Sequence, residues 1–285
     1  MKPLKATPAN IKRAAAVIRR GGVAAFPTET VYGLGADGFN PGACARIFEI
    51  KKRPRFDPLI LHAASLAQTK KLFSKIPKPA LKLMKKFWPG PLTLVLPKAK
   101  IVPGIVTAGL DTVAVRVPAH PVALKLIKLS GRPIAAPSAN LFGGLSPITA
   151  RHVKNQLGNG PDIILDGGKT RVGVESTIIA FLGGKPVLLR PGGVAVEKIE
   201  RTVGKLFTPS GAAKKPLAPG GLKKHYSPAV KLKLINNESE ARPGTRSAYL
   251  AFSKRPLGKY KKAELLSAKG CLRGRGEPVQ MSSFP

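Results

Sequence analysis

Short apolar runs alternate with segments of helical periodicity through roughly the first two hundred residues, and this alternation limits the possible folds more than any other feature. Runs such as Leu92–Leu96 and Val113–Val117 are rich in Val and Leu and are bounded by Pro or polar residues, which is typical of buried strands. The segments between the runs place apolar residues three and four positions apart, as on one face of a helix. The pattern predicts a single α/β domain around a mixed sheet.

The expected elements follow from this pattern. We expect helices that begin at Pro8 and Pro41, and a loop over the segment PTETVYGLGADGFN between the first strand and the second helix. Strands are expected at 23–26, 59–61, 92–96, 113–117, 134–136, 163–165, 177–181 and 187–189, and further helices at 65–73, 77–87, 120–129, 149–157 and 196–203.

The chain changes character after the two hundredth residue, where Pro, Gly and Lys accumulate. We therefore expect an α/β domain over residues 1–205 and a linker or lid over 206–229. Residues 230–285 hold two apolar runs, VKLKLI and SAYLAF, and are short for an independent domain, so we expect a truncated α/β unit. From about residue 269 the hydrophobic periodicity is lost, which favours a disordered tail.

The charge balance is extreme, with 49 Lys and Arg against 14 Asp and Glu, a formal net charge of +35. Such a chain attracts phosphates, nucleotides or nucleic acid. Residues 69–88 carry seven Lys and no acid, with apolar residues at helical spacing between them. This segment predicts surface helices with a basic outer face. We favour a solvated face over a dedicated RNA groove, and expect at most weak association with RNA or tRNA.

Several classes of protein are disfavoured. Only Cys44 and Cys271 are present, which indicates a reducing, cytoplasmic location. No apolar stretch reaches the length that a transmembrane helix needs, so no membrane contact is expected. The four His are dispersed, no Cys/His cluster has metal-ligand spacing, and no G-x-S-x-G is present, so neither a metal site nor a conventional nucleophile is predicted.

Two glycine-rich motifs resemble nucleotide-binding loops and are rejected. Residues 33–38 form a literal G-x-G-x-x-G after a strand, but the next helix begins only at Pro41, after the glycines, and no acid ends the following strand. Residues 167–170 resemble the end of a P-loop, but the first glycine of that motif would fall at Ile163.

Cationic side chains lie at or within the expected strands and helix ends. Arg116 interrupts the apolar run VAVRVP, and an arginine buried there needs an anionic partner. That partner is either an internal carboxylate or a bound carboxylate or phosphate. Lys51 and Arg53 end a helix, where simple capping of the helix C-terminus is the alternative to a role in a site.

Polar residues also lie at the ends of the expected strands. Ser138 and Asn140 occur in APSAN, a composition that also favours a plain turn, and His62 could be only a partly buried histidine at a strand end. Each alternative is reasonable singly. Together these residues place several cations and hydroxyls at strand ends, which favours an anion-binding site.

A series of motifs resembles the YrdC/Sua5 family of L-threonylcarbamoyladenylate synthases. FPTETVYGLGADG, K-x-R at Lys51 and Arg53, PLILH, PGPLTLVL, VAVRVP, APSAN, VESTII and LRPGG occur in the family's order, and PGGLKKHYSP resembles the linker of the Sua5 branch. The resemblance covers roughly residues 10 to 230. It implies a YrdC-like open twisted mixed sheet with flanking helices.

The resemblance also implies a reaction. L-Threonine, bicarbonate and ATP give threonylcarbamoyl-AMP and pyrophosphate, the first step of a tRNA adenosine modification that a downstream transferase completes. The carbamate, the carboxylate and the triphosphate are all anions, so the resemblance implies catalysis by positioning and charge stabilisation, with Mg²⁺ carried by ATP and no enzyme nucleophile.

Transferring the family's roles motif by motif assigns the candidate site. Asp57 departs from the family, which often has Asn there, and a carboxylate next to a triphosphate is unfavourable. The resemblance implies catalytic roles for Lys51, Arg53, Ser138 and Asn140, a threonine pocket of Thr30, His62, Arg116 and Ser176, and an ATP site of Arg53, Asp57, Thr112, Ser138, Ser146, Arg190 and Tyr226.

Two other functions fit the sequence less well. The first is an RNA-binding module of the same fold without turnover, for which the net charge of +35 would be the main feature. The second is a carbamoyltransferase similar to the YrdC-like domains of hydrogenase-maturation proteins, but the zinc-finger and acylphosphatase-like regions of those proteins are not found in this sequence.

Overall fold

The computed structural model describes residues 2–208, 218, 238–240, 244–251 and 258–265. The chain divides into two compact units, Met1–Ser227 and Pro228–Pro285. In the described part of the second unit, a short 3₁₀ turn at Glu238–Glu240 accompanies a parallel pair of strands, β11 (Gly244–Ala251) and β12 (Tyr260–Leu265). The described residues include no helix that is both long and apolar enough to cross a bilayer.

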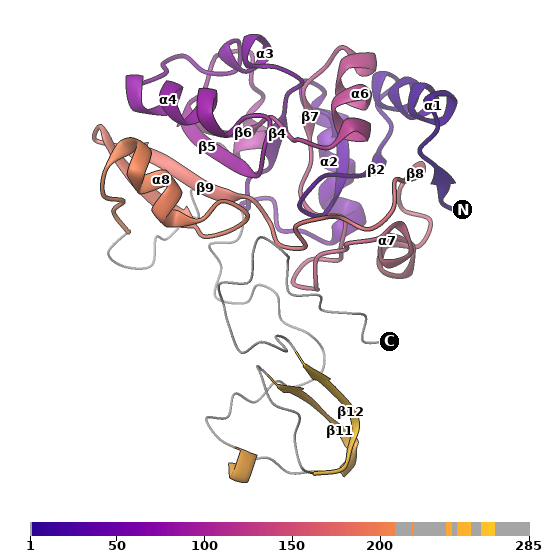
Figure 1. The fold of residues 1–285 in the computed structure, drawn as a ribbon. Coiled ribbons are helices and arrows are strands. Elements are labelled where there is room, and N and C mark those ends of the chain that lie inside the picture. The colour runs from indigo at the N-terminus through magenta and orange to yellow at the C-terminus, as the bar shows by residue number, and fades with distance from the viewer. Residues whose placement is uncertain (1, 209–217, 219–237, 241–243, 252–257, 266–285) are drawn as a thin grey trace. The chain divides into compact units, whose positions relative to one another are not determined.

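A mixed sheet of ten strands forms the first unit (Figure 1). The order across the sheet is β1-β8-β2-β3-β7-β4-β6-β5-β9-β10, so both parallel and antiparallel neighbours occur. The strands are β1 (Leu4–Lys5), β2 (Ala24–Pro27), β3 (Tyr32–Asp37), β4 (Ile60–His62), β5 (Leu92–Pro97), β6 (Thr112–Arg116), β7 (Ile134–Ala135), β8 (Ile163–Asp166), β9 (Thr177–Leu182) and β10 (Lys185–Arg190).

Eight helices accompany the sheet in the described part of this unit. Several begin where the sequence provides a capping side chain: Thr7, Asn40 and Thr149 each accept a hydrogen bond from a backbone N–H of the first turn. The helices are α1 (Pro8–Arg19), α2 (Pro41–Lys51), α3 (Leu66–Lys70), α4 (Lys78–Phe87), α5 (Gly104–Thr107), α6 (Pro121–Ser130), α7 (Ala150–Leu157) and α8 (Val196–Val203).

The helices cover the two faces of the sheet unequally (Figure 1). One face packs against α2, α4, α5, α7 and α8 in the main hydrophobic core. The other face carries α1 and α6, but only over the half of the sheet around β8, β2 and β3. On the remaining half, which includes Ile60, Ala114 and Ile178, the packing partner among the described residues is Ala218 and no helix. Among the described residues, this half of the face therefore has no helix over it.

The prediction of a loop over PTETVYGLGADGFN was wrong for residues 32–37, because Tyr32–Asp37 forms the buried strand β3. Its glycines replace side chains that could not fit. A Cβ at Gly35 would lie 2.5 Å from the Cγ2 atom of Ile134 and 2.8 Å from Phe26. The G-x-G-x-x-G therefore allows close packing within a sheet, and it opens no helix for a dinucleotide.

The remaining differences are small. The helix expected at 65–73 is shorter and covers Leu66–Lys70, while β1, β12 and the one-turn α5 were not predicted. The apolar run SAYLAF lies largely in β11, as expected for a strand. The run VKLKLI and the tail from residue 269 lie outside the described residues.

Candidate active site

A pocket lies where the ends of β4 and β6 meet the turn after β2, on the half of the sheet that none of the described helices covers. Side chains far apart in the sequence reach it because these strands are neighbours in the sheet: His62 pairs with Arg116 in parallel register. The lining residues are Thr28, Thr30, Val31, Tyr32, Gly33, Arg53, Ile60, His62, Arg116, Ala136, Pro137, Ser138, Glu175, Ser176 and Arg190.

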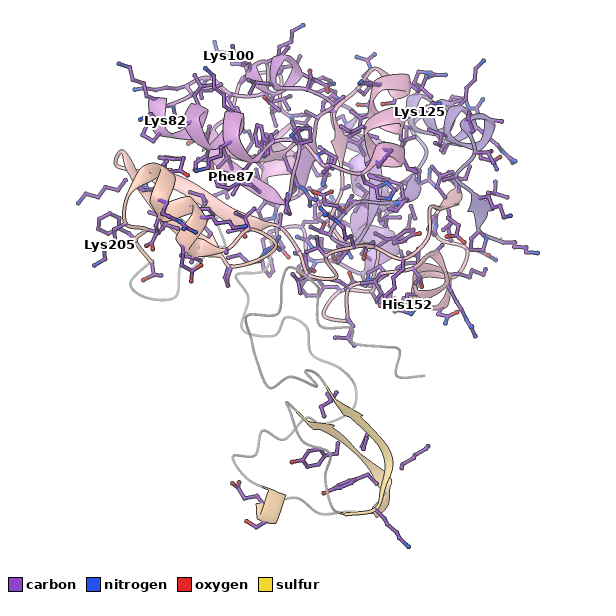
Figure 2. All side chains as sticks on the ribbon, viewed as in Figure 1. Lys82, Phe87, Lys100, Lys125, His152 and Lys205 are labelled. Atoms are coloured by element: carbon purple, nitrogen blue, oxygen red, sulfur yellow. The ribbon has the colours of Figure 1, made fainter. Side chains whose placement is uncertain are left out.

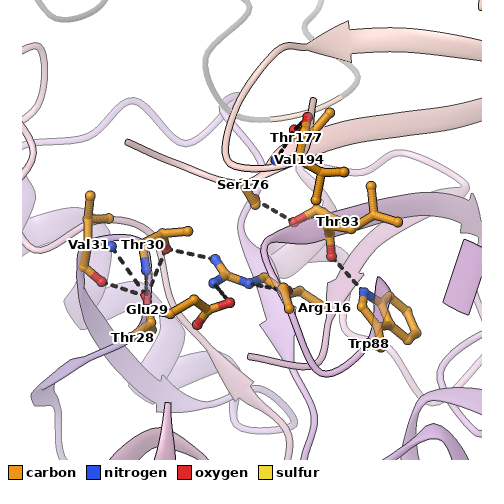
Figure 3. A network of polar contacts seen from close by, with 12 residues as sticks. Thr28, Glu29, Thr30, Val31, Trp88, Thr93, Arg116, Ser176, Thr177 and Val194 are labelled. Atoms are coloured by element: carbon orange, nitrogen blue, oxygen red, sulfur yellow. Dashed lines mark hydrogen bonds and ion pairs between the residues drawn. The ribbon is translucent and has the colours of Figure 1, made fainter. Parts of the chain in front are cut away.

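Arg116 is held by partners on three sides (Figure 3). Its Nε donates to the backbone oxygen of Gly90 at 3.2 Å, and Nη1 donates to the hydroxyl of Thr30 at 3.0 Å. Its Nη2 lies 2.5 Å from Oε1 of Glu29. Both side chains of this ion pair are 4% exposed. Of the two partners that the sequence left open for Arg116, the internal carboxylate is therefore present, and it is Glu29.

The turn between β2 and β3 fixes Glu29 in place. The Thr28 hydroxyl accepts hydrogen bonds from the backbone N–H groups of Thr30 and Val31 and donates to the Val31 carbonyl at 2.7 Å. Burial is the largest influence and raises the pKa of Glu29, but the Arg116 guanidinium together with hydrogen bonds from the backbone of Glu29 and Ala119 outweighs it, so the pKa lies below its ordinary value. Glu29 is therefore an ionised partner of Arg116.

His62 and Ser176 complete this end of the pocket. Burial and the nearby Arg116 charge lower the pKa of His62 to about 3, so the imidazole is neutral at physiological pH. The hydroxyls of Ser176 and Thr93 lie 2.7 Å apart and share a hydrogen bond (Figure 3). This end of the pocket thus combines one arginine, its buried carboxylate, a neutral histidine and hydroxyl groups.

Arg53 lines the other end of the pocket and has its own buried acid. Its Nη2 lies 2.8 Å from Oδ2 of Asp57, and it also donates to the backbone oxygens of Asp57 and Pro58. Asp57 is fully buried and does not line the pocket, so in this structure it contacts the arginine from behind. Burial raises the pKa of Asp57 despite the Arg53 charge.

Lys51 lies beneath the turn that carries Ser138 and Asn140. Its ammonium group donates to the backbone oxygens of both residues at 2.5 Å, and the Ser138 hydroxyl donates to Oδ1 of Asn140 at 2.5 Å. Burial, and then the Arg53 charge, place the pKa of Lys51 well below its usual value. Ser138 lines the pocket, whereas Lys51 and Asn140 fix its position from behind.

Arg190, the last residue of β10, reaches the pocket beside Ser176. Its guanidinium donates to the backbone oxygen of Ser176 at 3.0 and 3.2 Å. Gly192 permits this approach, since a Cβ there would lie 2.4 Å from the Glu175 carbonyl oxygen. Glu175 in turn accepts a hydrogen bond from the Ser146 hydroxyl.

The structure therefore brings most of the predicted residues together. Lys51, Asp57, Asn140 and Ser146 surround the pocket without lining it. Thr112 lies at the opposite end of β6 from Arg116, about 13 Å away at ~3.3 Å per residue, although on the same face of the strand. Tyr226 lies outside the described residues. The predicted residues that line the pocket are Thr30, Arg53, His62, Arg116, Ser138, Ser176 and Arg190.

The sequence analysis assigned no site role to Thr28, Glu29 or Glu175. All three adjoin predicted residues in the segments PTET and VEST. The signal that could have found the two glutamates is the scarcity of acids. The chain has only 14 Asp and Glu, and two of them directly precede predicted site residues, which is expected if they balance the charge of nearby arginines or lysines.

Fold and pocket together define an α/β protein with a pocket at the strand ends of a mixed sheet, lined by three arginines. The described residues contain no cluster of three or more His, Cys, Asp or Glu that could hold a metal ion. A model of the Sua5/YciO/YrdC family, described as telomere recombination, matches residues 16–192. A model described as the C-terminal domain of threonylcarbamoyl-AMP synthase matches residues 194–277.

Two curated relatives and one solved structure agree with these matches. A threonylcarbamoyl-AMP synthase of Pyrococcus abyssi is 52% identical over 79% of this chain and 67% of its own length. The enzyme of that name in Bacillus subtilis is 48% identical over 81% of this chain and 68% of its own length. The crystal structure of P. abyssi Sua5 complexed with L-threonine superposes with a TM-score of 0.83 at 42% identity, covering 93% of this chain and 82% of that one.

This chain belongs to the Sua5/YrdC family. It spans about two thirds of the length of the curated relatives. The sequence resemblance and the expected YrdC-like α/β fold are thereby confirmed.

Proposed function

We propose that the chain is an L-threonylcarbamoyladenylate synthase, a nucleotidyltransferase that converts L-threonine, bicarbonate and ATP to threonylcarbamoyl-AMP and pyrophosphate. The observation that carries the proposal is the convergence of three arginines, Arg53, Arg116 and Arg190, on one pocket whose other lining residues supply hydroxyls, a neutral histidine, apolar groups and, among the described residues, a single carboxylate, Glu175. This suits a reaction that brings together a carboxylate, a carbamate and a triphosphate, which are all anions. The relatives that bear this name support it.

The two ends of the pocket suggest a division of work. Arg116, with Thr30 and Ser176, would hold the carboxylate and hydroxyl of threonine. Arg53, Arg190 and Ser138 would hold the phosphates of ATP, and Thr112 and Tyr226 would contact the nucleotide further out. The threonine amine would capture CO₂ as a carbamate with loss of a proton, and a carbamate oxygen would then attack the α-phosphorus from the threonine end as pyrophosphate leaves on the other side. Binding both substrates in one pocket supplies the orientation that this step needs.

Mg²⁺ would enter with ATP. Glu175 is the one carboxylate that lines the pocket among the described residues, and Mg²⁺ commonly binds through one or two carboxylates together with substrate phosphates. When bound, the ion neutralises charge on the triphosphate. The residues present therefore fit a metal carried by the nucleotide and provide no separate cage for it.

The proposal is tested by incubating the chain with ATP and bicarbonate and measuring pyrophosphate with and without L-threonine. We expect release that depends on threonine and stops when bicarbonate is removed. Release that is unaffected by threonine, or none at all, would exclude the synthase function.

The downstream partner would be a tRNA-modifying transferase, and a weak attraction of tRNA to the basic surface is part of the proposal. Residues 58–110 contain nine Lys and no Asp or Glu. Lys82 and Lys100 are both exposed on the surface that includes α4 (Figure 2). Binding of tRNA should weaken steeply with salt, and Lys82→Glu should reduce that salt dependence while leaving pyrophosphate release unchanged.

We also propose the division of the chain expected from its sequence and a cytoplasmic location. Residues 1–205 would form the synthase domain, 206–229 the lid, and 230–285 the Sua5-type C-terminal region. The family models meet between residues 192 and 194, near the first of these limits.

A further inference from the structure

Glu29 is the one acid at the threonine end of the pocket that the proposed function leaves without a role. Its carboxylate lies 2.5 Å from Arg116, both its oxygens are buried, and it does not line the pocket. Glu29 thus contacts Arg116 from the side away from a ligand. Any effect it has on the ligand must pass through Arg116.

The contacts of Arg116 involve all three nitrogens of its guanidinium. Nε donates to the Gly90 oxygen, Nη1 donates to the Thr30 hydroxyl, and Nη2 lies 2.5 Å from Oε1 of Glu29 in an ion pair. A guanidinium carries five N–H groups, more than these partners use, so a carboxylate ligand can also be bound. Glu29 and its neighbours thereby orient the guanidinium.

Charge is the second consequence of this pair. Arg116 and His62 line this end, and His62 is neutral because burial and Arg116 lower its pKa to about 3. Arg190 and Glu175 also line the pocket, and Arg190 donates to the oxygens of Ser176. The Arg116–Glu29 pair itself carries no net charge, because Glu29 is ionised. A bare buried arginine would attract any carboxylate, whereas a neutral pair penalises a ligand that brings an unbalanced negative charge.

We propose that Glu29 is a positioning and specificity-determining residue, which makes the Arg116 subsite select zwitterionic α-amino acids over carboxylic acids that lack the ammonium group. The inference rests on the proposed function and deepens it. An α-amino acid binds with no net charge and leaves the subsite neutral. Its 2-hydroxy analogue binds as an anion and leaves one negative charge buried beside Glu29. The carbamate charge that arises later in the reaction develops toward Arg53 and Arg190.

The test compares the binding of L-threonine with that of 2,3-dihydroxybutanoate, in which a hydroxyl replaces the ammonium group. Calorimetry is performed near neutral pH without ATP or bicarbonate. We expect the wild type to favour threonine by about tenfold or more, and Glu29→Gln to lose or reverse this preference because the anion now balances Arg116. A residue with only a structural role would weaken both ligands equally.

The chain offers a matched control. Asp57→Asn removes the carboxylate of the other buried arginine pair, at the nucleotide end, and should leave the ratio of the two affinities within about twofold of wild type. Glu29→Asp keeps the charge and should keep the preference. Thermal unfolding of each variant shows whether it is folded.

The outcomes separate the two proposals. Threonine-dependent pyrophosphate release by the wild type tests the synthase function alone. If release occurs but the wild type binds both ligands equally, or a folded Glu29→Gln keeps the threonine preference, the role of Glu29 is overturned and the synthase function stands. The wild-type comparison needs no variant, so it decides against the inference even if Glu29→Gln does not fold.

Discussion

Two buried arginine–carboxylate pairs lie at opposite ends of the pocket, and they are built differently. Arg116 pairs with Glu29 at 2.5 Å and Arg53 pairs with Asp57 at 2.8 Å, and all four side chains are at most 4% exposed. The pKa of Glu29 is nevertheless lowered, whereas that of Asp57 is raised. The balance of burial against the charge of the partner decides the direction in each case.

The difference shows how one pocket can treat two substrates of different net charge, a zwitterion and a triphosphate. The ionised Glu29 cancels the charge of Arg116 where a small zwitterion is expected. At the other end Arg53 and Arg190 line the pocket together, and the Asp57 carboxylate is held behind Arg53, away from the space that phosphates would occupy. Asp57 contacts Arg53 and does not line the pocket, so its role in ATP binding stays a prediction.

The largest expected effect comes from Arg116→Ala. We expect threonine-dependent pyrophosphate release to fall by about a hundredfold or more, and the free energy of unfolding to fall by about 3–5 kcal/mol because Glu29 is left buried without its partner. Assays of pyrophosphate and urea denaturation measure the two effects. The double variant Arg116→Ala/Glu29→Ala should regain stability but not activity. Recovery of activity in the double variant would show that Arg116 serves only the ion pair.

Lys51→Met should act on the nucleotide end alone. It leaves the carbonyls of Ser138 and Asn140 without their donor, which costs about 1–3 kcal/mol of stability and displaces the Ser138 hydroxyl. We expect the KM for ATP to rise by about tenfold or more while the Kd for threonine changes less than about twofold. An equal loss for both substrates would mean that the two ends of the pocket are not independent.

The two carboxylates should give opposite pH dependences of stability. Glu29 has a lowered pKa, so its contribution is present above its ordinary value of 4.5 and is lost as pH falls through the folded-state pKa. Asp57 has a raised pKa, so its contribution is complete below its ordinary value of 3.8 and is lost as pH rises through the folded-state pKa. From acid to neutral pH, the free energy of unfolding of the wild type should therefore increase relative to that of Glu29→Gln. Over the same range it should decrease relative to that of Asp57→Asn. Urea denaturation across that range checks both signs, and equal signs would contradict the contrast.

His62→Gln gives the smallest expected effect. The pKa of His62 is lowered from 6.5 to about 3 by burial and by Arg116, so the unfolded chain takes up a proton first as the pH falls. Wild type should lose stability relative to His62→Gln below pH 6.5, by less than about 1 kcal/mol between pH 7 and 6. No difference in slope would show that His62 is protonated in the folded protein.

Much of the architecture was predictable because hydrophobic periodicity is a local property. Helices α1, α2 and α8 begin at the predicted residues, and eight strands of the large sheet lie at predicted positions. The strand β3 was missed because glycines at alternate positions and the preceding Thr-rich turn imitate a loop, and only packing against Phe26 and Ile134 shows why glycine is required.

The candidate site divides in the same way. The sequence by itself determined which residue types serve the pocket: arginines within or directly after apolar strands, hydroxyls in the turns, and few acids to neutralise them. Only the tertiary structure decided which of these residues line the pocket and which support it. Strand order and register bring His62 beside Arg116 and leave Thr112 at the far end of β6. The packing of helix α2 places Lys51 beneath Ser138. The partner of Arg116 was equally undecided, because ion pairing depends on a distance of a few ångströms between residues that the sequence places 87 positions apart.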